Sequence, residues 1–142
     1  MTHAELIELL RNHKLAVESS LHADGRPQAA VVGFAVSDEL EIVFDTVTTS
    51  RKYHNLKRDP RCALVIGWDA EITVQIEGVA DEPTGDDLAR LKACYFVAYP
   101  DGRERARWPT IAYIRVRPRW IRYSDFTTTP APTIVELSGT CR

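Results

Sequence analysis

The chain has 142 residues, 44% of them hydrophobic, which is enough for one domain with its own core. Its 18 Lys and Arg against 20 Asp and Glu give a formal charge of -2, which excludes a general attraction to nucleic acid or acidic membranes. No stretch reaches the ~18 uncharged apolar residues of a membrane span, and Glu5 and Glu8 interrupt the apolar N-terminus, unlike a signal peptide. We expect a single domain over residues 1–142 in a soluble, unprocessed cytoplasmic protein.

A helix and a strand are predicted at the start of the chain. Thr2 followed three residues later by Glu5 is typical of a capping box and predicts a short amphipathic helix over residues 2–13. Residues 14–21 alternate in polarity, which predicts a strand. One face of this strand carries the apolar residues Leu15 and Val17. The other face carries the polar residues Lys14, Glu18 and Ser20.

Turn signals divide the rest of the chain into further elements. Strands are expected over residues 28–36, 40–44, 62–66, 72–77, 110–116 and 119–126. Helices are expected over residues 51–59, ended by Pro60, and over residues 86–99. Pro118 is expected at a bulge or a sheet edge between the last two strands, and residues 127–142 as a C-terminal tail.

The number and spacing of these strands predict the fold class. Six or seven strands, with turns about every ten residues and only short helices between them, favour a mainly β fold. A barrel fits this pattern better than a parallel α/β sheet does.

Cysteine and histidine spacing indicates neither a disulfide framework nor a metal site. Cys62, Cys94 and Cys141 are odd in number and far apart, and none belongs to a Cys-x-x-Cys pair. The four histidines show no ligand spacing. We therefore predict no metal.

Thr48-Thr49-Ser50-Arg51-Lys52 stands where a strand is expected to end and a helix to begin. Free backbone N–H groups and the dipole of a helix N-terminus favour an anion there, and the hydroxyls can donate hydrogen bonds. Two cations at that end oppose the dipole, and a bound phosphate would explain them. The alternative is that Ser50 only caps the helix while Arg51 and Lys52 are solvated.

Four motifs follow one another along the chain: Asp24-Gly25-Arg26-Pro27; Ser50-Arg51-Lys52 through Asn55-Leu56 and Asp59-Pro60-Arg61; Val74-Gln75-Ile76-Glu77-Gly78-Val79-Ala80; and Ile114-Arg115-Val116-Arg117-Pro118. Their order, over residues 15–125, resembles that of the pyridoxamine 5′-phosphate oxidase-like, FMN-binding split-barrel family. The resemblance implies six to seven antiparallel strands in a split barrel, and a homodimer with FMN between its subunits.

The resemblance also implies where the cofactor binds. Arg51 and Lys52 would hold the FMN phosphate with help from Ser50, and the strand from Ala30 would lie along the flavin ring. Thr73 stands where full-length oxidases of the family carry a glutamine that reaches the flavin. The implied cofactor-binding residues are Ala30, Val31, Val32, Gly33, Asp45, Thr46, Thr49, Ser50, Arg51, Lys52 and Thr73.

The C-terminus departs from the family's vitamin B6 oxidases. Those enzymes end in an Arg-Leu-His-Asp-Arg-like stretch that recognises pyridoxal phosphate, and this chain has none. We expect an FMN-dependent oxidoreductase that passes electrons between a nicotinamide and a small substrate, with catalytic residues unknown. The alternatives are a non-catalytic flavin-binding protein and a reductase that uses a deazaflavin.

A second cluster contains seven arginines between Arg103 and Arg122. Arg115, Arg117 and Arg119 alternate and would share one face of a strand. A solvated sheet face explains this pattern, and the alternatives are contacts to a nucleotide tail or a salt-bridge network in a dimer. Nucleic acid is not expected, because the patch lacks interleaved aromatic residues.

Overall fold

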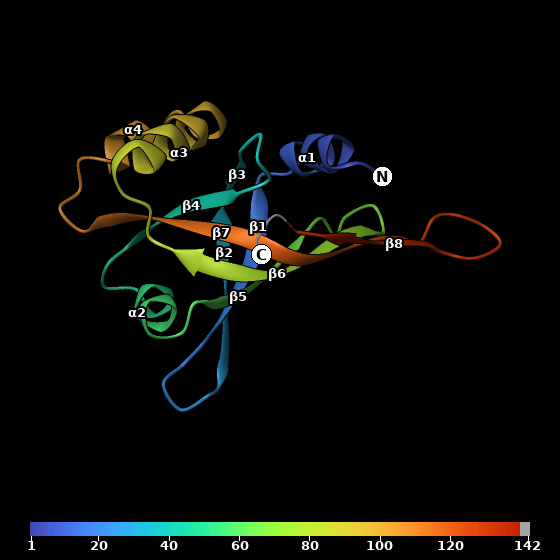
Figure 1. Ribbon diagram of the computed structural model, residues 1–142, viewed down its shortest axis with the longest axis horizontal. Coiled ribbons are helices and arrows are strands. Elements are labelled where there is room, and N and C mark those ends of the chain that lie inside the picture. The colour runs from blue at the N-terminus through green and yellow to red at the C-terminus, as the bar shows by residue number, and fades with distance from the viewer. Residues whose placement is uncertain (140–142) are drawn as a thin grey trace.

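The computed structural model describes residues 1–139, which form one antiparallel eight-stranded sheet with helices on its surface (Figure 1). The strands are β1 (Leu15–Leu21), β2 (Pro27–Gly33), β3 (Ala35–Val36), β4 (Ile42–Val47), β5 (Arg61–Ile66), β6 (Ile72–Asp81), β7 (Ile111–Asp125) and β8 (Thr133–Ser138). The helices are α1 (His3–Arg11), α2 (Arg51–Arg58), α3 (Gly85–Ala98) and α4 (Gly102–Arg105). The prediction of a mainly β fold with short helices is confirmed.

The sheet has the strand order β2-β1-β5-β6-β7-β4-β3, and β8 pairs with the second half of β7. It curls until β2, at one end, comes into contact with β4 near the other end. No hydrogen-bonded ladder joins β2 to β4 within the described residues, so the barrel is open between these two strands. Helix α2 packs against β1 and follows β4 directly, which places it at this opening.

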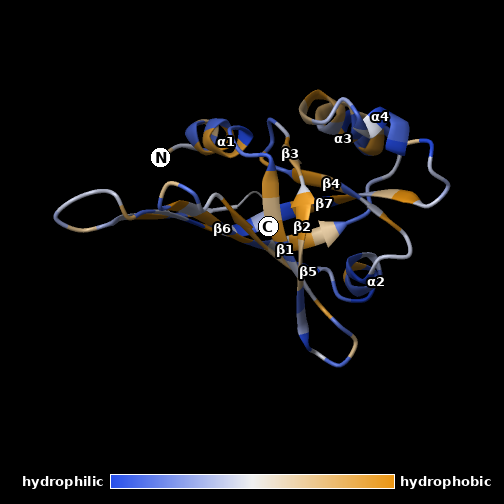
Figure 2. Cartoon of the chain, turned by 180° about the vertical axis from the view of Figure 1, so that it is seen from behind, coloured by the Kyte–Doolittle hydropathy of each residue, from blue (hydrophilic) through white to orange (hydrophobic). Residues whose placement is uncertain are grey.

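The core fills the inside of the curled sheet and includes Phe34, Phe44, Leu64 and Ile76, each at most 2% exposed. In Figure 2 the strands carry long hydrophobic segments, whereas α2 is mostly hydrophilic. Helices α3 and α4 lie together on the opposite side of the sheet from α2 (Figure 1). None of the helices in the described part of the chain is long and apolar enough to span a bilayer.

The alternation predicted for β1 is present, but the polar face of the strand is the buried one. Glu18 is 1% exposed and Ser20 is 3% exposed, whereas Leu15 is 47% exposed. The reason is that α2 packs against the polar face of β1, where Asn55 donates a 3.1 Å hydrogen bond to the Oγ of Ser20.

The C-terminal third of the sequence differs from prediction in its strands. The two strands expected on either side of Pro118 are one continuous strand, β7. The irregularity expected at Pro118 is present as a register shift, where Pro118 pairs with Gly78. A Cβ atom at Gly78 would lie 2.4 Å from the carbonyl oxygen of Arg117, so this close approach requires glycine.

Part of the predicted tail also belongs to the sheet. Residues 133–138 form β8, because they complete the hydrogen bonding of the edge of β7 and Leu137 packs against the core. The rest of that prediction includes residues 140–142 and therefore Cys141, which lie outside the described residues.

Candidate functional site

The candidate site begins at the first turn of α2, where Ser50 is the N-cap. The backbone N–H of Tyr53 donates to the Oγ of Ser50 over 3.2 Å, and the Oγ1 of Thr46 lies 2.9 Å from the same atom. Two predicted site residues are thereby brought together by the end of β4 and the start of α2. Thr49 lies beside them and is exposed.

Arg51 and Lys52 follow the cap and line a pocket of about 90 Å³ between α2, β1 and β2. Neither side chain forms an ion pair with any residue that the structure describes. Ala30 of β2 also lines the pocket, so residues of the predicted phosphate-binding segment and of the predicted ring-binding strand lie together here. Its remaining lining residues were not predicted from the sequence: Glu18, Ser20, Gln28, Ala29 and Asn55.

The predicted ring-binding strand, β2, is at an end of the sheet. The N–H of His22 donates to the carbonyl of Arg26, and the N–H of Phe34 donates to the carbonyl of Lys14. These two bonds show which residues of β2 direct their backbone N–H and C=O groups toward β1, because such residues alternate along an antiparallel pair. By this alternation the backbone groups of Val31 and Gly33 point away from β1. They lie at the opening beside β4, so they have no ladder partner within the described sheet.

The side chains of β2 divide between its two faces. Ala30 faces the pocket beside α2, and Val32 is 7% exposed in the core. Val31 is 61% exposed on the opposite face. Gly33 lies under the ring of Tyr99, because a Cβ atom at this position would lie 2.7 Å from that ring. Close packing against α3 therefore explains the glycine.

The side chain of Asp45, which the resemblance places among the cofactor-binding residues, does not line this pocket. Its Oδ2 accepts a 2.8 Å hydrogen bond from the Nε of Arg105, and its Oδ1 accepts one of 3.0 Å from the hydroxyl of Tyr95. Successive residues of a strand face opposite sides, so Thr46 points toward α2 while Asp45 points toward α3 and α4. Burial and the charge of Asp45 raise the pKa of Tyr95.

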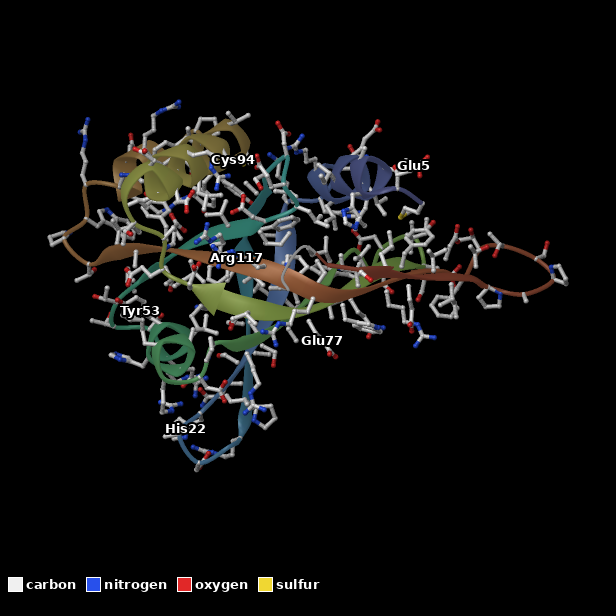
Figure 3. All side chains as sticks on the ribbon, in the orientation of Figure 1. Glu5, His22, Tyr53, Glu77, Cys94 and Arg117 are labelled. Carbon is white, nitrogen blue, oxygen red and sulfur yellow. The ribbon has the colours of Figure 1, made fainter. Side chains whose placement is uncertain are left out.

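Thr73 is also not brought to the pocket within one chain. It lies at the start of β6 opposite Ser124, whereas α2 contacts the other end of β6, where Tyr53 donates a 2.9 Å hydrogen bond to Glu82. Because a strand rises by about 3.3 Å per residue, Thr73 is about 25 Å from Asp81 at the end of β6. Figure 3 shows Tyr53 on α2, beside this far end of β6.

The outer face of the sheet carries several exposed or half-exposed apolar side chains. Val31, Val17, Val65 and Gln75 form one row across β2, β1, β5 and β6. Val65 is 37% exposed and Leu15, one row away, is 47% exposed. Val17, Val31 and Val65 are thus three adjacent apolar side chains on one face of the sheet.

The arginine-rich strand is solvated only in part: Arg119 is exposed and the Arg117 side chain is 44% exposed, but Arg115 is buried. Arg115 is 5% exposed and forms ion pairs with Asp81, Glu41 and Asp87 at 2.7–3.2 Å. Arg90 of α3 binds the same Glu41 over 2.7 Å. Burial raises the pKa of Glu41, but hydrogen bonds from Arg90, Ser37 and Arg115 outweigh it and lower the pKa to about 2. These ion pairs link α3 to the sheet, because Arg90 and Asp87 belong to α3 and Arg115 belongs to β7.

A larger pocket, of about 430 Å³, lies between α1, β3 and α3. It is lined by Lys14, Phe34, Cys94 and Val97 among others, and by none of the predicted site residues. Among the described residues, no three His, Cys, Asp or Glu side chains gather in an arrangement that could hold a metal ion.

Residues 2–125 match the family model described as pyridoxamine 5′-phosphate oxidase. Curated relatives include the pyridoxine/pyridoxamine 5′-phosphate oxidases of Burkholderia vietnamiensis, 35% identical over 91 residues, and of Bordetella avium, 34% identical over 91 residues. Each alignment covers 63% of this chain and 41% of the relative. The matched region thus spans about two fifths of the length of these oxidases.

Solved structures of similar fold include a heme binding protein from Mycobacterium smegmatis, with a TM-score of 0.83 and 20% identity over 97% of this chain and 58% of that one. A pyridoxamine 5′-phosphate oxidase-related, FMN binding protein from Nostoc punctiforme has a TM-score of 0.68 and 11% identity over 95% of this chain and 94% of that one. At these identities the likeness shows the fold alone, and it identifies the curled sheet as a split barrel.

Proposed function

The chain belongs to the pyridoxamine 5′-phosphate oxidase family, and we propose that it is an FMN-dependent oxidoreductase that passes electrons between a nicotinamide and a small substrate. The observation that carries the proposal is the pair of cations at the start of α2, which line a pocket with β2 and have no carboxylate partner among the described residues. Cations that form no ion pair, next to the free N–H groups of a helix start, suit a phosphate.

The residues present fit the phosphate end of FMN. Arg51 offers a planar fork that can bind two phosphate oxygens, and Lys52 adds a compact charge. The hydroxyls of Thr49 and Ser50 lie at the same helix start and can donate to the remaining oxygen. In this arrangement the chain's own residues bind the anion and fix the position of whatever is attached to it.

The edge of β2 would position the flavin ring. The free backbone groups of Val31 and Gly33 match the hydrogen-bonding edge of an isoalloxazine, and the small side chain of Ala30 leaves room beside the phosphate pocket. When bound, FMN supplies the capacity to accept and release electrons, while the protein supplies binding, orientation and exclusion of water.

The proposal includes a homodimer with the cofactor at the subunit interface. The exposed apolar row of Val17, Val31 and Val65 offers a surface that a second copy can cover. Thr73 lies on the same sheet but too far from its own α2 to join that site, so it could contribute only to the site of a partner subunit.

Two alternatives follow from the sequence. A deazaflavin with a longer acidic tail would suit the arginine-rich strand, but the charge of Arg115 is already compensated by Asp81, Asp87 and Glu41. A non-catalytic flavin-binding protein would use the same pocket, and turnover of the bound flavin separates it from an oxidoreductase.

The visible spectrum of the purified protein tests the proposal. Bands of oxidised flavin, bleached by NADPH and restored by an added acceptor with turnover, support an oxidoreductase, and flavin bands without turnover support the binding protein. A colourless protein that does not quench the fluorescence of added FMN would contradict both.

The phosphate assignment has its own test. Replacing Arg51 and Lys52 by alanine should weaken FMN binding by about 2–5 kcal/mol in total, the scale of losing charge-assisted contacts. Arg107→Ala, which removes an exposed arginine outside the pocket, is the matched control and should leave the affinity unchanged. Unchanged affinity in the double variant would refute the assignment.

A further inference from the structure

Glu18 is a buried acid in the wall of the proposed phosphate pocket. Its side chain comes from the buried face of β1 and is 1% exposed. Its Oε1 has no hydrogen-bond partner among the residues that the structure describes. A buried, unsatisfied carboxyl oxygen is costly, so a natural sequence that keeps one beside two cations gives a reason to look for its partner in a ligand.

The groups around Glu18 determine its protonation. Arg51 and Lys52 of α2 line the same pocket, and the charge of Lys52 acts on Glu18, which in turn acts on Cys62 of β5. The residues of β2 in this pocket, among them Gln28 and Ala30, carry no charge. Burial raises the pKa of Glu18, and a hydrogen bond from Ser20 and the charge of Lys52 only partly offset this effect. Burial and the nearby Glu18 likewise raise the pKa of Cys62, so its thiol stays neutral.

A phosphate in this pocket further favours the neutral form of Glu18 over the ionised form. Phosphate oxygens accept hydrogen bonds and carry negative charge, so an ionised carboxylate beside them would be repelled and would have nothing to donate. A neutral carboxylic acid has an O–H group that can donate to a phosphate oxygen. The anion therefore favours the protonated form of the neighbouring acid.

We propose that Glu18 is a ligand-binding residue of this site, which donates a hydrogen bond from its neutral carboxyl group to an oxygen of the bound phosphate monoester. This inference rests on the proposed phosphate pocket and adds a consequence to it. Where Glu18 is ionised in the free protein, binding takes up one proton from solvent, and that proton is released again when the ligand leaves.

The test is a titration of FMN between about pH 5 and pH 9 with the wild type and Glu18→Gln. Glutamine keeps a neutral donor at every pH, so its profile reflects only the phosphate's own ionisation near pH 6. Below the pKa of Glu18 in the free protein, the two proteins should bind alike. Above that pKa, wild-type affinity should fall relative to the variant, by up to tenfold per pH unit.

Controls separate this inference from the loss of the fold or of the whole site. Glu8→Gln changes an exposed glutamate on α1 and should follow the wild-type profile. Thermal unfolding should show that each variant is folded. In calorimetry, the binding enthalpy of the wild type above the pKa of Glu18 should vary with the ionisation enthalpy of the buffer more than that of Glu18→Gln does, because only the wild type protonates Glu18.

The possible outcomes are distinct. If Glu18 stays neutral up to about pH 9, the profiles of the wild type and Glu18→Gln run parallel, and Glu18→Ala, which removes the donor, should then weaken FMN binding at every pH. FMN binding that depends on Arg51 and Lys52 but is unchanged in Glu18→Ala would overturn the role of Glu18 alone. An ionised Glu18 that accepts a hydrogen bond from a ligand hydroxyl would also give no proton uptake, and it counts against the inference. Failure of the wild type to bind FMN at every pH would overturn both the pocket and this inference.

Discussion

At the scale of residues, the arginines of this chain fall into two groups. Arg90, Arg105 and Arg115 each bind carboxylates of their own chain, and their charge holds the fold together. Arg51, with its neighbour Lys52, has no such partner among the described residues and faces a pocket. Sequence pattern does not separate the groups, because Glu41, which binds both Arg90 and Arg115, comes from a distant segment. Only the fold shows which cations remain available to a ligand.

Asp45 provides a test of this division. Because its carboxylate binds Arg105 and Tyr95, Asp45→Asn should leave FMN affinity unchanged. The change should lower the free energy of unfolding by about 1–3 kcal/mol, since it weakens a charge-assisted contact of a largely buried arginine. Urea denaturation measures the loss. A variant of normal stability with weakened FMN binding would show that the Asp45 side chain serves the ligand after all.

At the scale of elements, the sequence predicted local features well. The capping box of Thr2 and Glu5 is present, and Ser50 caps α2 as expected, because these signals act over three or four residues. The buried face of β1 could not be predicted, since it depends on α2, which lies more than thirty residues later. The same holds for β8, which forms because the edge of β7 needs a partner. The turn between β1 and β2, near which His22 lies in Figure 3, is where Asp24-Gly25 predicted it.

The attachment of α3 to the sheet should depend on pH through Glu41. Its pKa is lowered from 4.5 to about 2 in the folded chain, so its contribution to stability is present above the unfolded value and is lost as the pH falls from about 4.5 toward 2. Glu41→Gln should therefore cost about 3 kcal/mol at neutral pH and almost nothing near pH 2.

Denaturant unfolding at a series of pH values measures this effect. Glu39→Gln is the matched control, because Glu39 also contacts Arg90 but its side chain is 66% exposed, and its effect should be small at every pH. A loss in Glu41→Gln that does not shrink in acid would mean that packing, and not charge, fastens α3.

At the scale of the whole molecule, the fold exposes an apolar sheet face and separates Thr73 from the pocket of its own chain. Val65→Asp would place a charge in the middle of that face, where a second subunit is proposed to pack. Because the Val65 side chain is 37% exposed in the single chain, the variant should stay folded while the dimer dissociates.

Sedimentation measures the change in mass. Val97→Asp is the control, because Val97 is 83% exposed on α3 and does not belong to the row of Val17, Val31 and Val65, so this variant should remain dimeric. FMN affinity should fall with dissociation in Val65→Asp, since the proposed site includes a residue of the partner. A Val65→Asp protein that stays dimeric would place the interface elsewhere.

The central proposal is that the pocket at the start of α2 binds the phosphate of FMN. Comparing FMN with riboflavin, which has the same ring and ribityl chain but no phosphate, isolates that recognition. The wild type should bind FMN more tightly by at least about 2 kcal/mol, roughly thirtyfold, and the double alanine variant of Arg51 and Lys52 should lose this preference. Equal affinity of the wild type for FMN and riboflavin would contradict the assignment.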